Sequence, residues 1–410
     1  MHLNPEAAGF SGERLERITA HLNHNYVEPG KIAGCQVLVS RHGQNAYFRS
    51  LGLMDRERDK PVQEDTIWRL YSMTKPIASV ALMMLYEEGR FQLNDPVYRF
   101  IPSWRDHQVW VAGEGESMQT RPPESPMTMR HVLSHTAGLT YGDILVMGEL
   151  HPVDKAYQAA GVSRGPGETL TSFAGNLSQV PLRYDPGTRW QYSIATDVCG
   201  CLVEILADQP FADFLQERIF APLDMHDTGF YVPDEKIQRF AANYQRGRDK
   251  SLRLGDDPLE SSFRQMPSFP SGGGGLVGTT RDYARFCEML RRGGELDGAR
   301  IIGDRTLRLM TRNHLKDGAD LGNFAMGAFS ETAYDGVGFG LGFAMTLDEV
   351  QAGTIGAGDY YWGGAASTIF WVDPVEDLYV IFMTQFMPSA TFNFRGQLKN
   401  IIYAALQDEG

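Results

Sequence analysis

The sequence YSMTKP, residues 71 to 76, lies where a short run of strand-forming residues, IWRLY (67–71), meets a segment with helical periodicity. If Ser72 opens this helix, Lys75 lies one turn later on the same face, so its amine lies beside the Ser72 hydroxyl. A serine hydroxyl is a weak nucleophile until a neighbouring group removes its proton. The spacing therefore predicts a nucleophile at Ser72 and part of the general-base machinery at Lys75.

Lys75 can accept a proton only where its surroundings keep the amine neutral. The ordinary pKa of a lysine is about 10.4, so the amine carries a proton at neutral pH. Burial and the positive end of a helix dipole both lower the pKa of an amine at the start of a helix. The S-x-x-K spacing occurs once in the sequence, and it falls in the strand-to-helix context that the motif requires.

Periodicity elsewhere predicts strands near both ends of the chain and helices between them. A β-hairpin is predicted over 32–52, and two apolar strands over STIFWVDP (367–374) and LYVIFMTQF (378–386). Helices are predicted over residues 11–22, 73–88, 280–290 and 394–406. Residues 90–265 alternate short helical segments with loops rich in Pro and Gly.

These elements predict an α+β fold with one antiparallel sheet built from both ends of the chain. The first and last helices would flank this sheet, and the central segment would be inserted as a second lobe. We expect a sheet domain formed by residues 1–71 and 270–410. We expect residues 72–269 to form a mainly helical domain with long loops.

Composition limits the partners of the protein. The chain has 38 Lys and Arg against 51 Asp and Glu, a formal net charge of -13 at pH 7, which repels nucleic acid and anionic membrane surfaces. No apolar run approaches the roughly 20 residues that span a bilayer, and the N-terminal sequence lacks the pattern of a secretory signal. We therefore expect a cytoplasmic protein acting on a small neutral molecule. The spacing of the four cysteines predicts neither a disulfide framework nor a zinc site; these residues are Cys35, Cys199, Cys201 and Cys287. No metal or cofactor is predicted.

Further motifs accompany Ser72 and Lys75 along nearly the whole chain. They are Tyr192-Ser193, Trp362-Gly363-Gly364, LSHTAGL (133–139) and SGGGGLVGTT (271–280). With these motifs the sequence resembles the serine β-lactamase and penicillin-binding protein superfamily, its class C branch in particular, and most of all the family VIII carboxylesterases. The resemblance implies a β-lactamase-like fold and a serine hydrolase.

The resemblance also implies a role for each motif residue. Tyr192 would join Lys75 in a proton relay, and which of the two is the base stays open. The backbone N–H groups of Ser72 and Ala365 would bind the oxyanion. Gly363 and Gly364 would let their strand approach the substrate.

Trp362 stands where the β-lactamases of this superfamily carry the lysine of K-T-G. That lysine would hold the carboxylate of a penicillin, whereas a tryptophan offers apolar surface to a neutral group. We therefore predict a serine carboxylesterase for short-chain esters. Acyl transfer, amidase, weak β-lactamase or D-peptidase activity, and an inactive binding protein are the alternatives.

Several other patterns favour ordinary structural roles. The G-x-S-x-G pattern at 161–165 contains Ser163, but the segment before it is predicted to be helical, not the strand that a nucleophile elbow needs. His135 is predicted to be a hydrogen-bonded structural histidine, and His226 and His314 carry less signal still. The glycine run at 271–275 lacks the G-K-[ST] of a phosphate loop, so close packing near the active-site sheet is expected.

Overall fold

A single large sheet organises the protein. The computed structural model describes residues 2–142, 149–162, 165–325 and 334–407. Within them, one antiparallel sheet of eight strands runs in the order β12-β13-β14-β15-β16-β1-β2-β3. The strands are β1 (Gly34–Arg41), β2 (Gln44–Asp55), β3 (Lys60–Pro61), β12 (Val337–Phe339), β13 (Ala344–Thr346), β14 (Tyr360–Gly363), β15 (Ile369–Asp373) and β16 (Leu378–Thr384).

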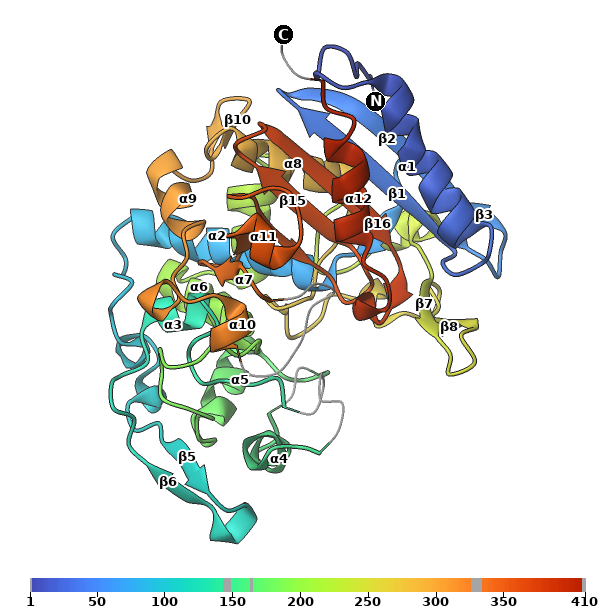
Figure 1. Cartoon of the computed structure of the whole chain (residues 1–410). Helices are drawn as coiled ribbons and strands as arrows, with labels where there is room; N and C mark the ends of the chain where they lie inside the picture. The colour runs from blue at the N-terminus through green and yellow to red at the C-terminus, as the bar shows by residue number, and fades with distance from the viewer. Residues whose placement is uncertain (1, 143–148, 163–164, 326–333, 408–410) are drawn as a thin grey trace.

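The sheet joins the two ends of the chain, as predicted. The early strand β1 pairs with the late strand β16, from Cys35 opposite Thr384 to Arg41 opposite Leu378. Figure 1 shows the blue N-terminal strands beside the red C-terminal strands. The predicted hairpin and the two late strands are confirmed, and β12 and β13 extend the sheet beyond them.

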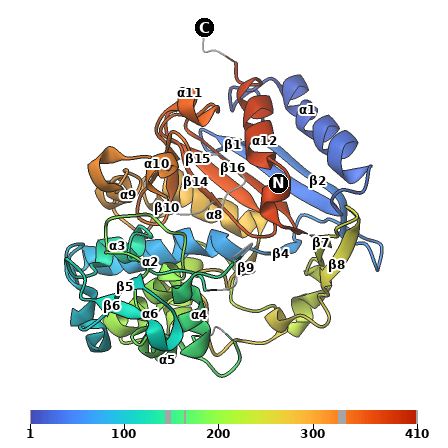
Figure 2. The ribbon, with the colours of Figure 1, turned by 60° about the horizontal axis from the view of Figure 1, so that its bottom comes forward.

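Helices cover both faces of the sheet. Helices α1 (Gly12–Leu22) and α12 (Phe394–Tyr403) pack together on one face, and α8 (Thr280–Arg291) packs on the other, against β1, β15 and β16. Figure 2 shows α1 and α12 side by side in front of the sheet and α8 behind it. The Ser11 hydroxyl caps α1 by accepting from the Arg14 N–H, and Leu15, Ile18 and Leu22 face the core.

A buried helix, α2 (Thr74–Glu87), runs through the remaining helical part of the molecule. All its residues from Thr74 to Leu85 are buried, and it packs against α6 and α7. The other helices of this part are α3 (Met129–Leu133), α4 (Pro152–Ala159), α5 (Leu170–Leu177), α6 (Ala195–Ala207) and α7 (Phe211–Leu215), of which α3 and α5 pack against α6. Three short helices, α9 (Asp304–Met310), α10 (Leu321–Phe324) and α11 (Glu349–Ala352), lie between α8 and β14 in the sequence.

The segment 90–265 contains strands that its local pattern did not predict. Strands β5 (Val109–Ala112) and β6 (Gln119–Arg121) form a hairpin, while β7 (Asn243–Arg246) pairs with β8 (Leu252–Asp256) and with β17 (Phe386–Met387). These strands are short and partly exposed, and β7 gains its second partner from the far end of the chain. The local alternation of apolar and polar residues cannot predict pairing between segments so far apart in the sequence. The two-domain division at residues 72 and 269 stays a prediction.

Two short strand pairs complete the described structure. Strand β4 (Ile67–Arg69) pairs with β9 (Val277–Thr279), and β10 (Glu295–Leu296) pairs with β11 (Ala299–Arg300). In the described part of the chain, no helix has the length and apolarity needed to cross a bilayer. The cytoplasmic location stays a prediction.

Candidate active site

Ser72 lies at a sharp junction between a strand and a buried helix. After β4, the Leu70 N–H donates to the Leu276 carbonyl at 2.9 Å, and Tyr71 takes a positive φ of 44°. A bulky residue rarely adopts this left-handed backbone conformation, so the junction is strained. A 3₁₀ turn, η2 (Tyr71–Met73), then leads into α2 and carries Ser72. The predicted strand-to-helix context of Ser72 is confirmed.

Three predicted residues meet at the Ser72 hydroxyl. The Lys75 Nζ lies 3.1 Å from the Ser72 Oγ, and the Tyr192 Oη donates to the same oxygen at 2.7 Å. Lys75 and Tyr192 are 1% and 3% exposed, while Ser72 is 9% exposed. The serine oxygen therefore has two candidate proton acceptors within hydrogen-bond distance, in surroundings that exclude bulk water.

Burial governs the protonation of Tyr192. Loss of solvent raises the pKa of the Tyr192 phenol to about 12, against smaller opposing effects of hydrogen bonds with Ser72, Trp362 and Tyr141. The phenol is thus neutral and donates a hydrogen bond in the free enzyme at pH 7. It can return a proton to a leaving group more readily than it can act as the first base.

The Lys75 amine is held from several sides. Its Nζ donates to the Gly273 carbonyl at 2.6 Å. It also lies 4.7 Å from the centre of the Tyr192 ring and 5.5 Å from that of Tyr141. These contacts fix the amine beside Ser72.

Strand β14 brings the predicted Trp362-Gly363-Gly364 segment to the same place. It packs against the turn that carries Ser72. A Cβ on Gly364 would lie 2.2 Å from the Thr368 Oγ1 and 2.4 Å from the Leu70 carbonyl oxygen, so only glycine fits. The next residue, Ala365, is partly exposed, and no described residue accepts a hydrogen bond from its N–H. That N–H is available to an incoming oxygen atom.

Trp362 does more than supply an apolar surface. Its Nε1 donates to the Tyr192 Oη at 3.4 Å, and the two rings lie 5.3 Å apart in a tilted arrangement. The buried Arg395 of α12 donates to the Trp362 carbonyl at 3.0 Å, which ties β14 to the C-terminal helix. The tryptophan thus both lines the site and orients the tyrosine hydroxyl.

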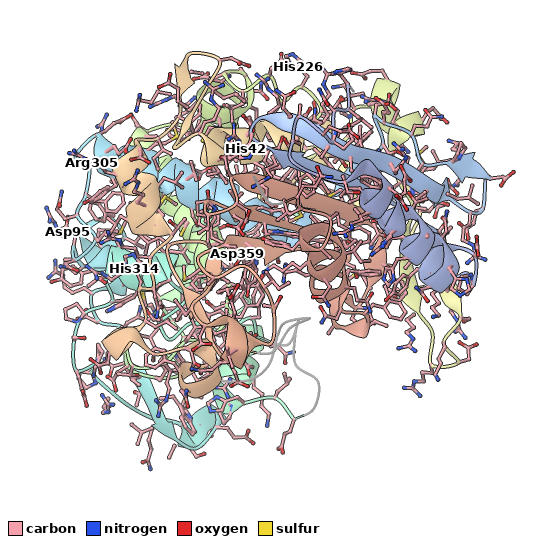
Figure 3. All side chains as sticks on the ribbon, turned by 45° about the horizontal axis from the view of Figure 1, so that its top comes forward. His42, Asp95, His226, Arg305, His314 and Asp359 are labelled. Atoms are coloured by element: carbon pink, nitrogen blue, oxygen red, sulfur yellow. The ribbon has the colours of Figure 1, made fainter. Side chains whose placement is uncertain are left out.

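The three histidines considered in the sequence, His135, His226 and His314, make other contacts than one with the Ser72 hydroxyl. His135 is buried behind Tyr192, and its Nδ1 lies 3.1 Å from the Ser193 Oγ. Burial holds the pKa of His135 well below its ordinary range, so the imidazole is neutral. His226 and His314 lie on different sides of the molecule (Figure 3); the first is exposed, and the second contacts the Leu309 carbonyl.

Of the G-x-S-x-G pattern, Ser163 and Arg164 lie outside the described residues. The segment before the pattern forms helix α4, as predicted. Among the described residues, no group of three or more His, Cys, Asp or Glu side chains is arranged to hold a metal ion. The four cysteines are buried and free.

The structure adds three groups that the motif analysis missed: Tyr141, the Gly273 carbonyl and Asp197. Tyr141 follows the LSHTAGL stretch by two residues and lies against both Lys75 and Tyr192. Asp197 is wholly buried at the start of α6 and contacts the glycine run. An acidic residue directly before the apolar stretch VCGCLVEIL was the available signal for Asp197.

A cavity of about 1050 Å³ lies beside the end of the glycine run. Its lining is mixed: aromatic and apolar side chains such as Phe263 and Phe269 alternate with charged and polar ones such as Glu260 and Arg264, and Gly274 and Gly275 form one wall. A Cβ on Gly274 would lie 3.6 Å from the Tyr71 carbonyl carbon. Gly274 thus lies between the cavity and the junction that carries Ser72, while Ser72, Lys75 and Tyr192 are not among the residues that line the cavity.

Tyr192→Phe is expected to lower kcat by about 10² to 10³-fold, since the ring packing stays while the proton donor is lost. KM should change by less than about threefold if the hydroxyl serves proton transfer and not the uniform binding of substrate. Steady-state kinetics with a p-nitrophenyl ester measures both constants. A kcat near that of the wild type, with an unchanged melting temperature, would remove Tyr192 from the relay.

Comparison with known proteins identifies the family to which this fold belongs. A profile of the Beta-lactamase family matches residues 19–402. Esterase EstB of Burkholderia gladioli is 33% identical over 373 residues, which cover 86% of each chain. Acyltransferase calJ of Penicillium decumbens is 25% identical over 336 residues, which cover 80% of this chain and 78% of calJ.

Solved structures agree with the sequence relatives. EstCE1, a hydrolase with promiscuous acyltransferase activity, has a TM-score of 0.79 at 27% identity, covering 96% of this chain and 99% of that one. The fold and these relatives define a serine hydrolase of the class that includes esterases and acyltransferases. The chain belongs to the Beta-lactamase family, and the expected β-lactamase-like fold is confirmed.

Proposed function

We propose that the protein is a carboxylesterase of family VIII that acts through an acyl-enzyme on Ser72. The observation that carries the proposal is the meeting of Lys75 Nζ and Tyr192 Oη at the Ser72 Oγ, at 3.1 and 2.7 Å. Nucleophilic catalysis by serine needs a proton acceptor and a proton donor within this distance.

In the proposed reaction, neutral Lys75 takes the Ser72 proton as the Oγ attacks the ester carbonyl carbon. The carbonyl oxygen becomes an oxyanion, which accepts hydrogen bonds from the N–H groups of Ser72 and Ala365. The tetrahedral intermediate collapses, the bond to the alcohol oxygen breaks, and Tyr192 passes a proton to the leaving alcohol while Lys75 reprotonates the phenol. Water then attacks the acyl-enzyme by the same steps in reverse, and Ser72 is restored.

Trp362 favours neutral esters as substrates. A buried indole at the position of a lysine provides no cation for the carboxylate of a β-lactam. We propose short acyl chains beside Trp362 and Tyr192, with the alcohol part of the ester in the cavity bordered by Phe263 and Phe269.

Acyl transfer is the second candidate, because relatives of this chain carry that name: acyltransferase calJ and EstCE1 with its promiscuous acyltransferase activity. In this reaction an acceptor alcohol replaces water at the acyl-enzyme. The ratio of ester product to acid, measured with added alcohol, separates the two activities.

An ester panel tests the proposed function. The rates on p-nitrophenyl acetate, butyrate and octanoate are compared with the rate on a chromogenic cephalosporin. We expect kcat/KM on butyrate to exceed that on the cephalosporin by at least about 10²-fold, a difference of roughly 3 kcal/mol in transition-state stabilisation. A preference for the cephalosporin would contradict the proposal.

A further inference from the structure

Asp197 is a buried carboxylate that the proposed mechanism leaves without a role. It lies in the first turn of α6, five residues after Tyr192, and is 0% exposed. Its Oδ1 accepts from the Ser271 Oγ at 2.5 Å and from the Gly273 N–H at 2.8 Å. Burying a carboxylate costs stability unless it has such partners.

The glycine run is shaped to reach this carboxylate. A Cβ on Gly273 would lie 2.8 Å from the Asp197 Oδ2, and a Cβ on Gly272 would lie 2.5 Å from the Thr196 carbonyl oxygen. Both contacts are too short for a real Cβ. The run therefore needs glycine where it meets the start of α6, a helix, whereas the sequence led us to expect close packing near the sheet.

Gly273 connects Asp197 to Lys75. Its N–H donates to Asp197, and its carbonyl accepts from the Lys75 Nζ at 2.6 Å. A neutral amine has two N–H bonds and one lone pair. With one N–H directed to Gly273, the lone pair can be directed at the Ser72 Oγ, 3.1 Å away.

We propose that Asp197 is a positioning residue: through Gly273 it sets the orientation of Lys75, and its negative charge stabilises the lysine ammonium that forms when Ser72 loses its proton. This inference rests on the proposed function, because it assumes that Lys75 is the base for Ser72. Asp197 itself touches neither the substrate nor the reacting atoms.

The titratable groups near Lys75 include Tyr141, Tyr192 and His135. Burial lowers the pKa of His135 and raises the pKa of Tyr192 to about 12, so neither is charged in the neutral range. The charge of Asp197 reaches this cluster, since it adds to the effect of burial on the pKa of Tyr192.

Asp197→Asn tests the proposal, because the amide oxygen can still accept from Gly273 while the charge is lost. We expect kcat to fall by about 10 to 100-fold with KM within about twofold. We also expect the acidic limb of kcat/KM to move by about one pH unit to lower pH. The acidic limb marks the pH at which Lys75, the proposed base, becomes protonated. Without the negative charge of Asp197 the ammonium form of Lys75 is less favoured, so Lys75 becomes protonated only at lower pH.

Asp282→Asn is the matched control. Asp282 is also buried at the third residue of a helix, where its Oδ2 accepts from the Asp227 N–H at 2.7 Å and from the Thr228 Oγ1 at 2.9 Å. Its replacement should lower the melting temperature and leave the kcat of the folded enzyme and the acidic limb in place. A wild-type kcat and limb in Asp197→Asn would overturn the proposal, as would changes no larger than those of the control.

If Asp197→Asn does not fold, Asp197→Glu tests the positioning role of Asp197. It keeps the charge but displaces the carboxylate, so kcat should fall by at least about tenfold with KM unchanged. A wild-type kcat would overturn the positioning role. Ser72→Ala, assayed in parallel, distinguishes a failure of the proposed function from a failure of this inference. Full activity in Ser72→Ala refutes the proposed function. Loss of activity in Ser72→Ala together with wild-type activity in Asp197→Asn refutes the inference alone.

Discussion

Ser72→Ala is expected to lower kcat/KM for a p-nitrophenyl ester by about 10⁴-fold or more, because no acyl-enzyme can form without the Oγ. The fold should be unaffected, since alanine fits the space and the site around it is preformed by β4, η2 and α2. Kinetics and thermal melting of the purified variant measure the two effects.

Ser79→Ala is the control for this variant. Ser79 is a buried serine on α2, and its Oγ has no hydrogen-bond partner among the described residues. Its removal should leave kcat/KM within about twofold of the wild-type value. Substantial activity in Ser72→Ala would show that another nucleophile acts.

Lys75→Met is expected to lower kcat by about 10³-fold or more. The methionine keeps an apolar stem of similar length in the buried space, while the proton acceptor 3.1 Å from Ser72 is lost. The remaining activity should lose its acidic limb, because the group that titrates there is gone. A pH profile of kcat/KM from pH 5 to pH 10 records both changes.

Lys75→Arg serves as the control for charge. Arginine keeps a cation near Gly273 but stays protonated at every accessible pH, so it should be as inactive as Lys75→Met. Activity close to wild type in Lys75→Arg would mean that the cation matters and the base does not. The acceptor of the serine proton would then have to be Tyr192.

The strand, helix and motif positions could be predicted from the sequence because each has a local signature. Helix α2 follows from its apolar spacing, and β16 from its run of apolar residues. Ser72 and Lys75 share one helix turn, so their contact is a matter of local geometry. Tyr192 and Trp362 came from the family resemblance, and no local rule places them beside Ser72.

Contacts between segments far apart in the chain could not be predicted from local sequence patterns. The pairing of β7 with β17 joins residues more than a hundred positions apart. The bond from Gly273 to Asp197 likewise depends on how the glycine run packs against α6. The motif at 362–364 indicates only an apolar surface at Trp362, so the hydrogen bond from its Nε1 to Tyr192 does not follow from the sequence.

Labelling with a fluorophosphonate, followed by peptide mass spectrometry, tests the central claim most directly. The reagent forms a stable phosphonyl ester with an activated serine, so the mass of its adduct marks the nucleophile. We predict one adduct per chain, on the peptide that contains Ser72, and no adduct in Ser72→Ala or after saturation with a slow ester substrate. An adduct on Ser163, or on any serine other than Ser72, together with loss of activity, would contradict this assignment of the active site.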